Sequence, residues 1–141
     1  MDTMNQASNL GLAEAQKALQ AIQAELIARG KAAVIVAADS HGELIALLRM
    51  DGAPLQSITI AMNKAYTAAR AQKPTRDIGQ KVRDAENGFD IAYYGDPRFI
   101  GWGGGVPVRV NGQVVGAVAV SGLPEAEDMQ VAALGAEAIT S

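Results

Sequence analysis

The stretch that decides the fold is Val106-Pro107-Val108-Arg109-Val110-Asn111-Gly112-Gln113-Val114-Val115-Gly116-Ala117-Val118-Ala119-Val120. It contains two apolar runs, 106–110 and 113–120, on either side of Asn111-Gly112. This pair accepts the positive φ angles of a tight two-residue turn, and between apolar runs it is the strongest short-range signal for a β-hairpin. The sequence therefore predicts an antiparallel hairpin here, with both strands largely buried.

A second hairpin is predicted upstream of the first. Residues 32–38 and 43–50 are short apolar runs. They are separated by Asp39-Ser40-His41-Gly42, a cluster of turn-forming residues that can reverse the chain within a few positions.

Helices are predicted for most of the remaining chain. Residues 10–29 carry apolar side chains at three- and four-residue steps, and residues 55–72, after Pro54, have a broad apolar face rich in small residues. Thr75 is expected to cap a helix that reaches about Asn87, and residues 124–139 form a closing helix. The connection over 89–105 is long for a compact domain, and such loops are often functional.

The order of these elements is helix, hairpin, two helices, loop, hairpin, helix. It favours an α+β fold with an antiparallel sheet and helices packed against it over alternating βαβ units. We expect one domain spanning residues 1–141.

Composition narrows the possible partners. A net charge of −3, one Trp and two Phe provide neither a basic surface for a phosphate backbone nor a set of platforms for nucleic-acid bases. The absence of cysteine excludes disulfides, thiolate metal sites and cysteine nucleophiles. The polar start, residues 1–6, and the lack of any apolar run near ~20 residues predict a cytoplasmic protein with no membrane partner.

Several spaced blocks cover nearly the whole chain: Val36-Ala37-Ala38-Asp39 with Gly42, Arg49-Met50-Asp51-Gly52-Ala53, Ile60-Ala61 with Lys64-Ala65 and Thr67-Ala68, Gly105-Val106-Pro107, and Gly116-Ala117-Val118-Ala119-Val120-Ser121-Gly122 with Asp128. Together they resemble the GlcG/HbpS family of small haem-binding or haem-degrading-type domains, which also includes the C-terminal domain of PduO-type proteins.

The resemblance implies an α/β sandwich with a central antiparallel sheet. It also implies a homo-oligomer, a dimer or higher, with pockets near the subunit contacts. Some members bind haem through a histidine or nearby polar residues, so haem is a possible cofactor and His41, the single histidine, its candidate ligand. The alternative for His41 is a turn residue exposed to water.

A small-molecule site is predicted from isolated polar residues among small apolar ones. Arg49, at a predicted strand end, would hold a carboxylate by paired hydrogen bonds, and Lys64 and Thr67 share one helix face. The predicted ligand-binding residues are Arg49, Lys64, Thr67, Gly104, Gly105 and Ser121. We expect the ligand to be haem, a related tetrapyrrole or a small organic (aromatic) carboxylate, held under a lid formed by the 89–105 connection.

Each of these residues also has a structural explanation. Arg49 can pair with Asp51, which can itself cap the next helix, and Lys64 can cover its helix while its ammonium pairs with a carboxylate. The glycines can simply form a turn before an edge strand, and Ser121 can cap the turn toward Pro124.

Two other functions are compatible with the sequence. One is a cofactor-independent lyase or isomerase acting on a catabolic intermediate, with Lys64, Asp51 or Tyr66 moving protons. Partial desolvation of Lys64 would lower its pKa and permit proton transfer or imine chemistry. The other is a structural assembly module. No cluster of His or Cys predicts a metal site.

Overall fold

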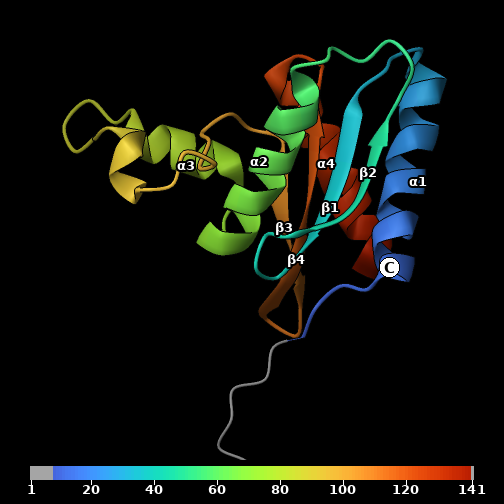
Figure 1. Cartoon of the computed structure of the whole chain (residues 1–141), viewed down its shortest axis with the longest axis horizontal. Coiled ribbons are helices and arrows are strands. Elements are labelled where there is room, and N and C mark those ends of the chain that lie inside the picture. Colours follow the sequence, from blue (N-terminus) through green and yellow to red (C-terminus); the bar gives the residue numbers. More distant parts are fainter. Residues whose placement is uncertain (1–7, 141) are drawn as a thin grey trace, which may run out of the picture.

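A four-stranded antiparallel sheet forms the centre of the computed structural model, which describes residues 8–140 (Figure 1). Its strands are β1 (Val34–Asp39), β2 (Leu44–Arg49), β3 (Gly105–Val110) and β4 (Gln113–Ser121), in the order β2-β1-β4-β3. Both predicted hairpins are confirmed, and pairing of β1 with β4 joins them into one sheet.

Helices cover both faces of this sheet. Figure 1 shows α1 (Leu12–Arg29) and α4 (Glu125–Thr140) on one side and α2 (Ser57–Ala71) on the other, while α3 (Thr75–Val82) stands out beside α2. A short 3-10 helix, η1 (Ile91–Tyr94), lies in the connection that follows α3. The predicted α+β architecture is therefore confirmed.

Two hydrophobic cores result, one on each face of the sheet. Because successive side chains of a strand point to opposite faces, β1 and β4 contribute alternately to both cores. Ile35 and Val120 pack with α1 and α4, whereas Val36 and Ala119 pack with α2. Apart from their polar ends, Asp39, Gln113 and Ser121, the central strands thus carry no polar side chain. The core on the α2 side is built mainly from alanine, so this helix lies close to the sheet.

Three predicted details are corrected by the structure. The first concerns β3, which is an edge strand with Arg109 and Val110 exposed, so only β4 of its hairpin is largely buried. The sequence pattern missed this because a valine-rich edge strand and a buried strand look alike.

The other two corrections concern α3. It ends at Val82 rather than near Asn87, because the Asp84 carboxylate accepts hydrogen bonds from the backbone N–H groups of Glu86 and Asn87 and turns the chain. These bonds lower the pKa of Asp84. Thr75 is the first helical residue rather than the cap, and its hydroxyl accepts the N–H of Gly105 at 3.0 Å.

Residues 1–6, whose polar character supports the prediction of cytoplasmic residence, lie outside the described part of the chain. Within residues 8–140, none of the helices combines the length and the hydropathy needed to cross a membrane. The same residues contain no group of three or more His, Asp or Glu side chains arranged to hold a metal ion.

Candidate functional site

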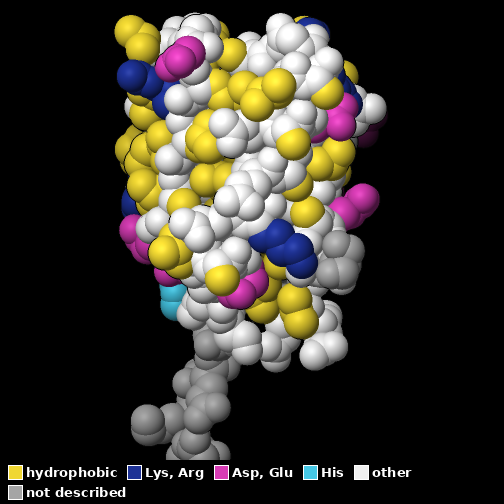
Figure 2. All heavy atoms as spheres, turned by 90° about the vertical axis from the view of Figure 1, so that its right-hand side faces the viewer, with side chains coloured by type: hydrophobic (Ala, Val, Ile, Leu, Met, Phe, Trp, Pro, Cys, Tyr) yellow, Lys and Arg dark blue, Asp and Glu magenta, His cyan; other side chains and the backbone are white. Residues whose placement is uncertain are grey.

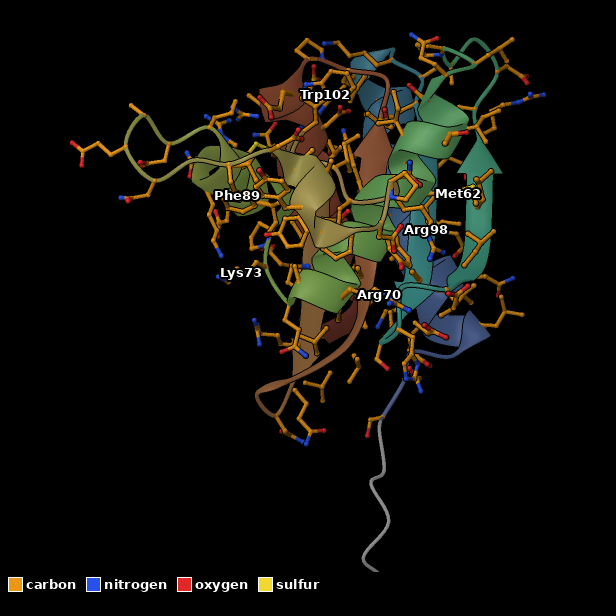
Figure 3. All side chains as sticks on the ribbon, turned by 60° about the vertical axis from the view of Figure 1, so that its left-hand side comes forward. Met62, Arg70, Lys73, Phe89, Arg98 and Trp102 are labelled. Atoms are coloured by element: carbon orange, nitrogen blue, oxygen red, sulfur yellow. The ribbon has the colours of Figure 1, made fainter. Side chains whose placement is uncertain are left out.

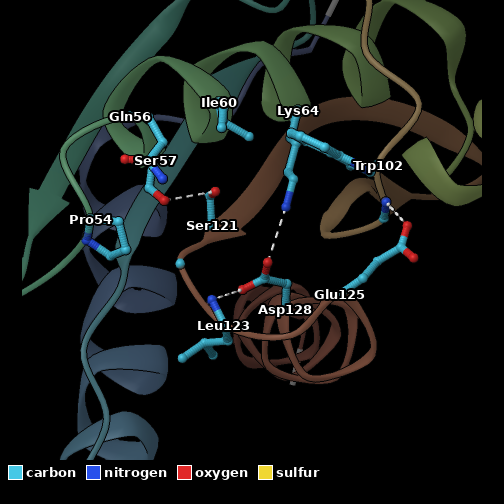
Figure 4. A pocket seen from close by; sticks show the side chains of 12 residues that line it. Pro54, Gln56, Ser57, Ile60, Lys64, Trp102, Ser121, Leu123, Glu125 and Asp128 are labelled. Atoms are coloured by element: carbon cyan, nitrogen blue, oxygen red, sulfur yellow. Dashed lines mark hydrogen bonds and ion pairs between the residues drawn. The ribbon is translucent and has the colours of Figure 1, made fainter.

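A pocket of about 400 Å³ lies where the end of β4 meets α2 and the first turn of α4 (Figure 4). Gly122, with φ +130°, turns the chain from β4 toward α4 and so opens this corner. The lining residues are Pro54, Gln56, Ser57, Ile60, Lys64, Trp102, Gly103, Ser121, Gly122, Leu123, Glu125 and Asp128. Residues from three separate segments of the chain, 54–64, 102–103 and 121–128, therefore build one site.

Lys64 is the central polar residue of the pocket. It lies on α2 among alanines, and its side chain is only 3 % exposed. Its ammonium donates to the carbonyl of Val120 at 3.0 Å and to Oδ2 of Asp128 at 3.2 Å. Burial lowers the pKa of Lys64, because desolvation penalises the charged form more than Asp128 favours it.

Asp128 holds Lys64 from the first turn of α4. Its second oxygen, Oδ1, accepts the backbone N–H of Leu123 at 3.1 Å, which fixes the carboxylate at the start of the helix. Burial raises the pKa of Asp128, against the opposing effect of the Lys64 charge. Each partner is therefore biased toward its neutral form, and a proton can pass from Lys64 to Asp128 without leaving two buried charges.

Not all hydrogen-bond donors of the pocket are used within residues 8–140. An ammonium has three N–H groups, and Lys64 uses two of them. Ser121 donates to the hydroxyl of Ser57 at 3.1 Å, and the Ser57 hydroxyl itself donates to no described group. One N–H and one O–H are thus left for a ligand, with Ile60 between them on α2 (Figure 4).

The charges of the pocket are already paired. Glu125, the other acid in the lining, accepts the N–H of Gly103 at 2.6 Å and lies 3.5 Å from Arg76. Because Lys64 is paired with Asp128, the pocket presents no free cation to an anionic ligand.

The glycine-rich segment before β3 packs against this ion pair. A Cβ atom at Gly104, where φ is +124°, would lie 2.7 Å from both Nζ of Lys64 and the carbonyl oxygen of Val120. At Gly105 it would lie 2.5 Å from the carbonyl oxygen of Lys64. The N–H groups of Gly103 and Gly105 are bound to Glu125 and Thr75, so these glycines serve close packing rather than anion binding.

The loop between η1 and β3 is anchored to the outer side of α2. Thr67 donates its hydroxyl hydrogen to the carbonyl of Arg98 and accepts the N–H of Ile100. The Tyr66 hydroxyl bonds to Asp96, and the Arg98 guanidinium lies 3.8 Å from the centre of the Tyr66 ring. Figure 3 shows Arg98 over α2, between Met62 and Arg70. Thr67 thus positions the loop that carries Trp102 to the pocket and does not itself line it.

The remaining predicted residues lie elsewhere. Arg49 and Asp51 line a separate hollow beside the end of α1, and His41 lies at the first hairpin turn with Ser40 and Gln72. Tyr66 borders a third, smaller cavity. Of the three proton-transfer candidates, only Lys64 lies in the pocket at the end of β4.

Sequence reasoning missed Asp128 and Ser57, which are hydrogen-bond partners of Lys64 and Ser121 in the site. A signal for Asp128 was present, because 128, 131, 132 and 135 are the buried positions of α4 and follow the spacing of a core-facing stripe. An acid on that stripe signals a buried partner. Ser57 had no signal, because nothing local shows that the start of α2 lies against Ser121 at the end of β4.

Comparison with known families shows which family this chain belongs to. The family described as haem degrading protein HbpS-like matches residues 10–137. The chain belongs to the HbpS-like family. The predicted resemblance is thereby confirmed.

Two relatives of this HbpS-like chain are proteins of Citrobacter freundii and Escherichia coli. A 15.0 kDa protein from the dhaT-dhaS intergenic region of Citrobacter freundii is 34% identical over 122 residues, 86% of either chain. GlcG of Escherichia coli K12 is 39% identical over 87 residues, 62% of either chain.

Solved structures share the fold. ORFY of Klebsiella pneumoniae has a TM-score of 0.93 and 30% identity, over 100% of this chain and 97% of the other. A PduOC–haem complex has a TM-score of 0.85 over 92% of this chain and 94% of the other, and its 22% identity supports likeness of fold alone.

A haem group fits the described residues poorly. Haem iron is usually held by His, Cys, Met or Tyr, and none of these lines the pocket beside Lys64. His41 is exposed, and its hollow is bordered mainly by polar residues and glycine, with Val114 as the one aliphatic side chain among its described neighbours. The chain therefore has a candidate axial ligand and a partly apolar pocket, but not in the same place.

Proposed function

We propose that this HbpS-like protein binds a small organic ligand in the pocket beside Lys64. The observation that carries the proposal is the pair of unused donors, one from Lys64 and one from Ser57, at the ends of a partly apolar cavity. Sites of this kind, concave with a few convergent polar groups, are the usual form of small-molecule pockets.

The chemistry of the pocket limits the kinds of ligand that we expect it to bind. Two unused donors call for acceptor oxygens, as in a carbonyl or carboxyl group. Trp102, 55% exposed at the rim, and Ile60 offer apolar surface to a flat ring. Since the charge of Lys64 is balanced by Asp128, we expect a neutral aromatic amide to bind at least as well as the corresponding carboxylate.

The test is an NMR titration of the ¹⁵N-labelled protein with benzamide and with benzoate. Saturable shifts at the amides of Ser57, Lys64 and Leu123 are expected. Ile60→Phe should fill the pocket and abolish them, whereas Met62→Phe, the matched change on the outer side of α2, should keep them. Shifts that survive Ile60→Phe unchanged, or no saturable shift with either compound, would refute the proposal.

Haem or a related tetrapyrrole is the second candidate ligand. It is supported by the description of the matching family as haem degrading. A hemin titration followed in the Soret band tests it, with His41→Ala as the variant. Saturable binding that the variant abolishes would establish ligation by His41, and non-saturable binding would eliminate the haem candidate.

We also propose that the protein forms a homo-oligomer, a dimer or higher. Hydrophobic side chains gather over the face that α1 and β2 present (Figure 2), and Leu12, Ile27 and Leu44 are exposed there. The edge strand β2 leaves backbone groups open to pairing. Light scattering after size-exclusion chromatography tests this, and a monomer at micromolar concentration would contradict it.

A further inference from the structure

Lys64 differs from every other lysine of the chain in its surroundings. Lys17, Lys31, Lys73 and Lys81 are exposed, whereas Lys64 is 2 % exposed and still lines a pocket. Neutral, nucleophilic lysine amines occur where the amine is shielded from water and can still be reached from a cavity.

A neighbour of Lys64 can accept the proton that the ammonium must lose before the amine can act as a nucleophile. Oδ2 of Asp128 is 3.2 Å from Nζ, and its Oδ1 is fixed by Leu123. The Val120 carbonyl, 3.0 Å from Nζ, orients the nitrogen from the sheet. The desolvation that lowers the pKa of Lys64 also raises the pKa of Asp128, so both shifts favour this transfer.

From this geometry we infer that Lys64 forms an imine with a small, neutral aldehyde bound in the pocket. The inference rests on the proposed ligand site and specifies its chemistry. An aldehyde is favoured over a keto acid because the pocket has no unpaired cation for a second, anionic group.

Imine formation needs no reactant other than the aldehyde, Lys64 and Asp128. Lys64 gives one proton to Asp128, and the nitrogen lone pair attacks the carbonyl carbon, forming a C–N bond while the C=O π pair moves to oxygen. That oxygen takes the proton back from Asp128, and the positively charged nitrogen then gives a proton to the Asp128 carboxylate, which leaves a neutral carbinolamine. Asp128 next protonates the hydroxyl group, which leaves as water while the nitrogen lone pair forms the C=N bond, so a protonated imine remains paired with the Asp128 carboxylate. Asp128 thus acts alternately as base and as acid.

The test is reductive trapping of the native protein with benzaldehyde and cyanoborohydride at neutral pH. Digestion and mass spectrometry then locate each benzyl group added to an amine. Lys64 should carry the adduct at lower benzaldehyde concentration than the four exposed lysines, and its labelling should saturate. Adducts confined to exposed lysines and the chain's α-amino group would overturn the inference.

Two controls make the result specific. Lys64→Met should lose the saturable adduct, whereas Lys73→Met, at an exposed position after α2, should retain it. The location of the adduct in the native chain decides the question even if Lys64→Met folds poorly. An excess of benzamide should protect Lys64 from labelling, since both compounds share one ring and one pocket.

The outcomes separate this inference from the proposed function. Saturable benzamide shifts without an adduct at Lys64 would leave the binding site intact and eliminate imine formation. Absence of both would refute both. An adduct at Lys64 that benzamide prevents would support both.

Discussion

Replacing Lys64 by methionine is expected to destabilise the fold markedly. The substitution keeps an unbranched side chain, shorter by one atom. Among residues 8–140 it leaves the buried carboxylate of Asp128 with the Leu123 N–H as its only donor, and the Val120 carbonyl loses the ammonium donor. Breaking a buried ion pair by removing one partner typically costs about 3–5 kcal/mol. We expect the lower end, about 3 kcal/mol, because water can reach Asp128 through the pocket.

The same structure predicts how the loss is recovered. Asp128→Asn removes the charge and keeps an oxygen that can accept the Leu123 N–H. The double variant Lys64→Met/Asp128→Asn should therefore be about 2 kcal/mol more stable than Lys64→Met, although it carries one more substitution.

The effect should also depend on pH. Burial raises the pKa of Asp128, and removing the Lys64 charge takes away the main influence that opposes this rise. A carboxyl group with a raised folded-state pKa contributes stability below its unfolded-state pKa, and this contribution is lost as the pH rises through the folded-state value. The penalty of Lys64→Met should thus shrink on acidification toward pH 4.

Urea denaturation followed by circular dichroism measures these differences. The single variant should lower the transition midpoint with little change in slope, and a loss of ~3 kcal/mol corresponds to roughly 10 °C in melting temperature for a chain of this size. A loss below about 1 kcal/mol for Lys64→Met, or simple additivity in the double variant, would refute the view that the pair is a coupled, buried unit.

Three further predictions concern the loop and the glycine segment. Hydrogen bonds from the Tyr66 hydroxyl, the largest influence, and from the backbone and side chain of Arg98 lower the pKa of Asp96 from 3.8 to about 2. The wild-type protein should therefore be more stable than Asp96→Asn above pH 3.8 and should lose this advantage as the pH falls through about 2. Equal acid unfolding curves of the two proteins would contradict this. Gly104→Ala should lower stability by roughly 2–4 kcal/mol in urea, because its methyl group would lie 2.7 Å from the buried ammonium at a φ that suits glycine. An unchanged midpoint would contradict it. Thr67→Val removes both hydrogen bonds of the Thr67 hydroxyl to the 98–100 segment and should therefore accelerate tryptic cleavage after Arg98. Cleavage at the wild-type rate would show that other contacts hold the loop.

The elements of the fold were predictable because their signals are local. Asn111-Gly112 specifies a turn from two residues, and the nearly continuous apolar runs of β1 and β4 are typical of strands that are buried on both faces. Burial of β3 was not predictable in the same way, because whether a strand lies at the edge depends on which strands pair, and the pairing of β1 with β4 is a long-range contact.

The candidate site was predictable only in part, for a geometric reason. Arg49 and Ser121 were expected to bind the same ligand, and the register does place both opposite Val34. They pair with β1 from its two sides, however, so one strand separates them by roughly 10 Å, two strand spacings. A ligand pocket on one face of the sheet therefore includes Ser121 and leaves Arg49 in another hollow.

The character of the pocket follows from the smallest residues around it. Alanines on α2 let the helix approach the sheet, and Gly104 and Gly105 let the backbone before β3 approach Lys64. This close approach is what removes water from Lys64, and desolvation is the largest influence on its pKa. Larger residues at these positions would push α2 outward and hydrate the amine, which would restore an ordinary, protonated lysine. The nucleophilicity that we infer for Lys64 is thus a consequence of packing, and glycine substitutions should weaken imine formation before they unfold the protein.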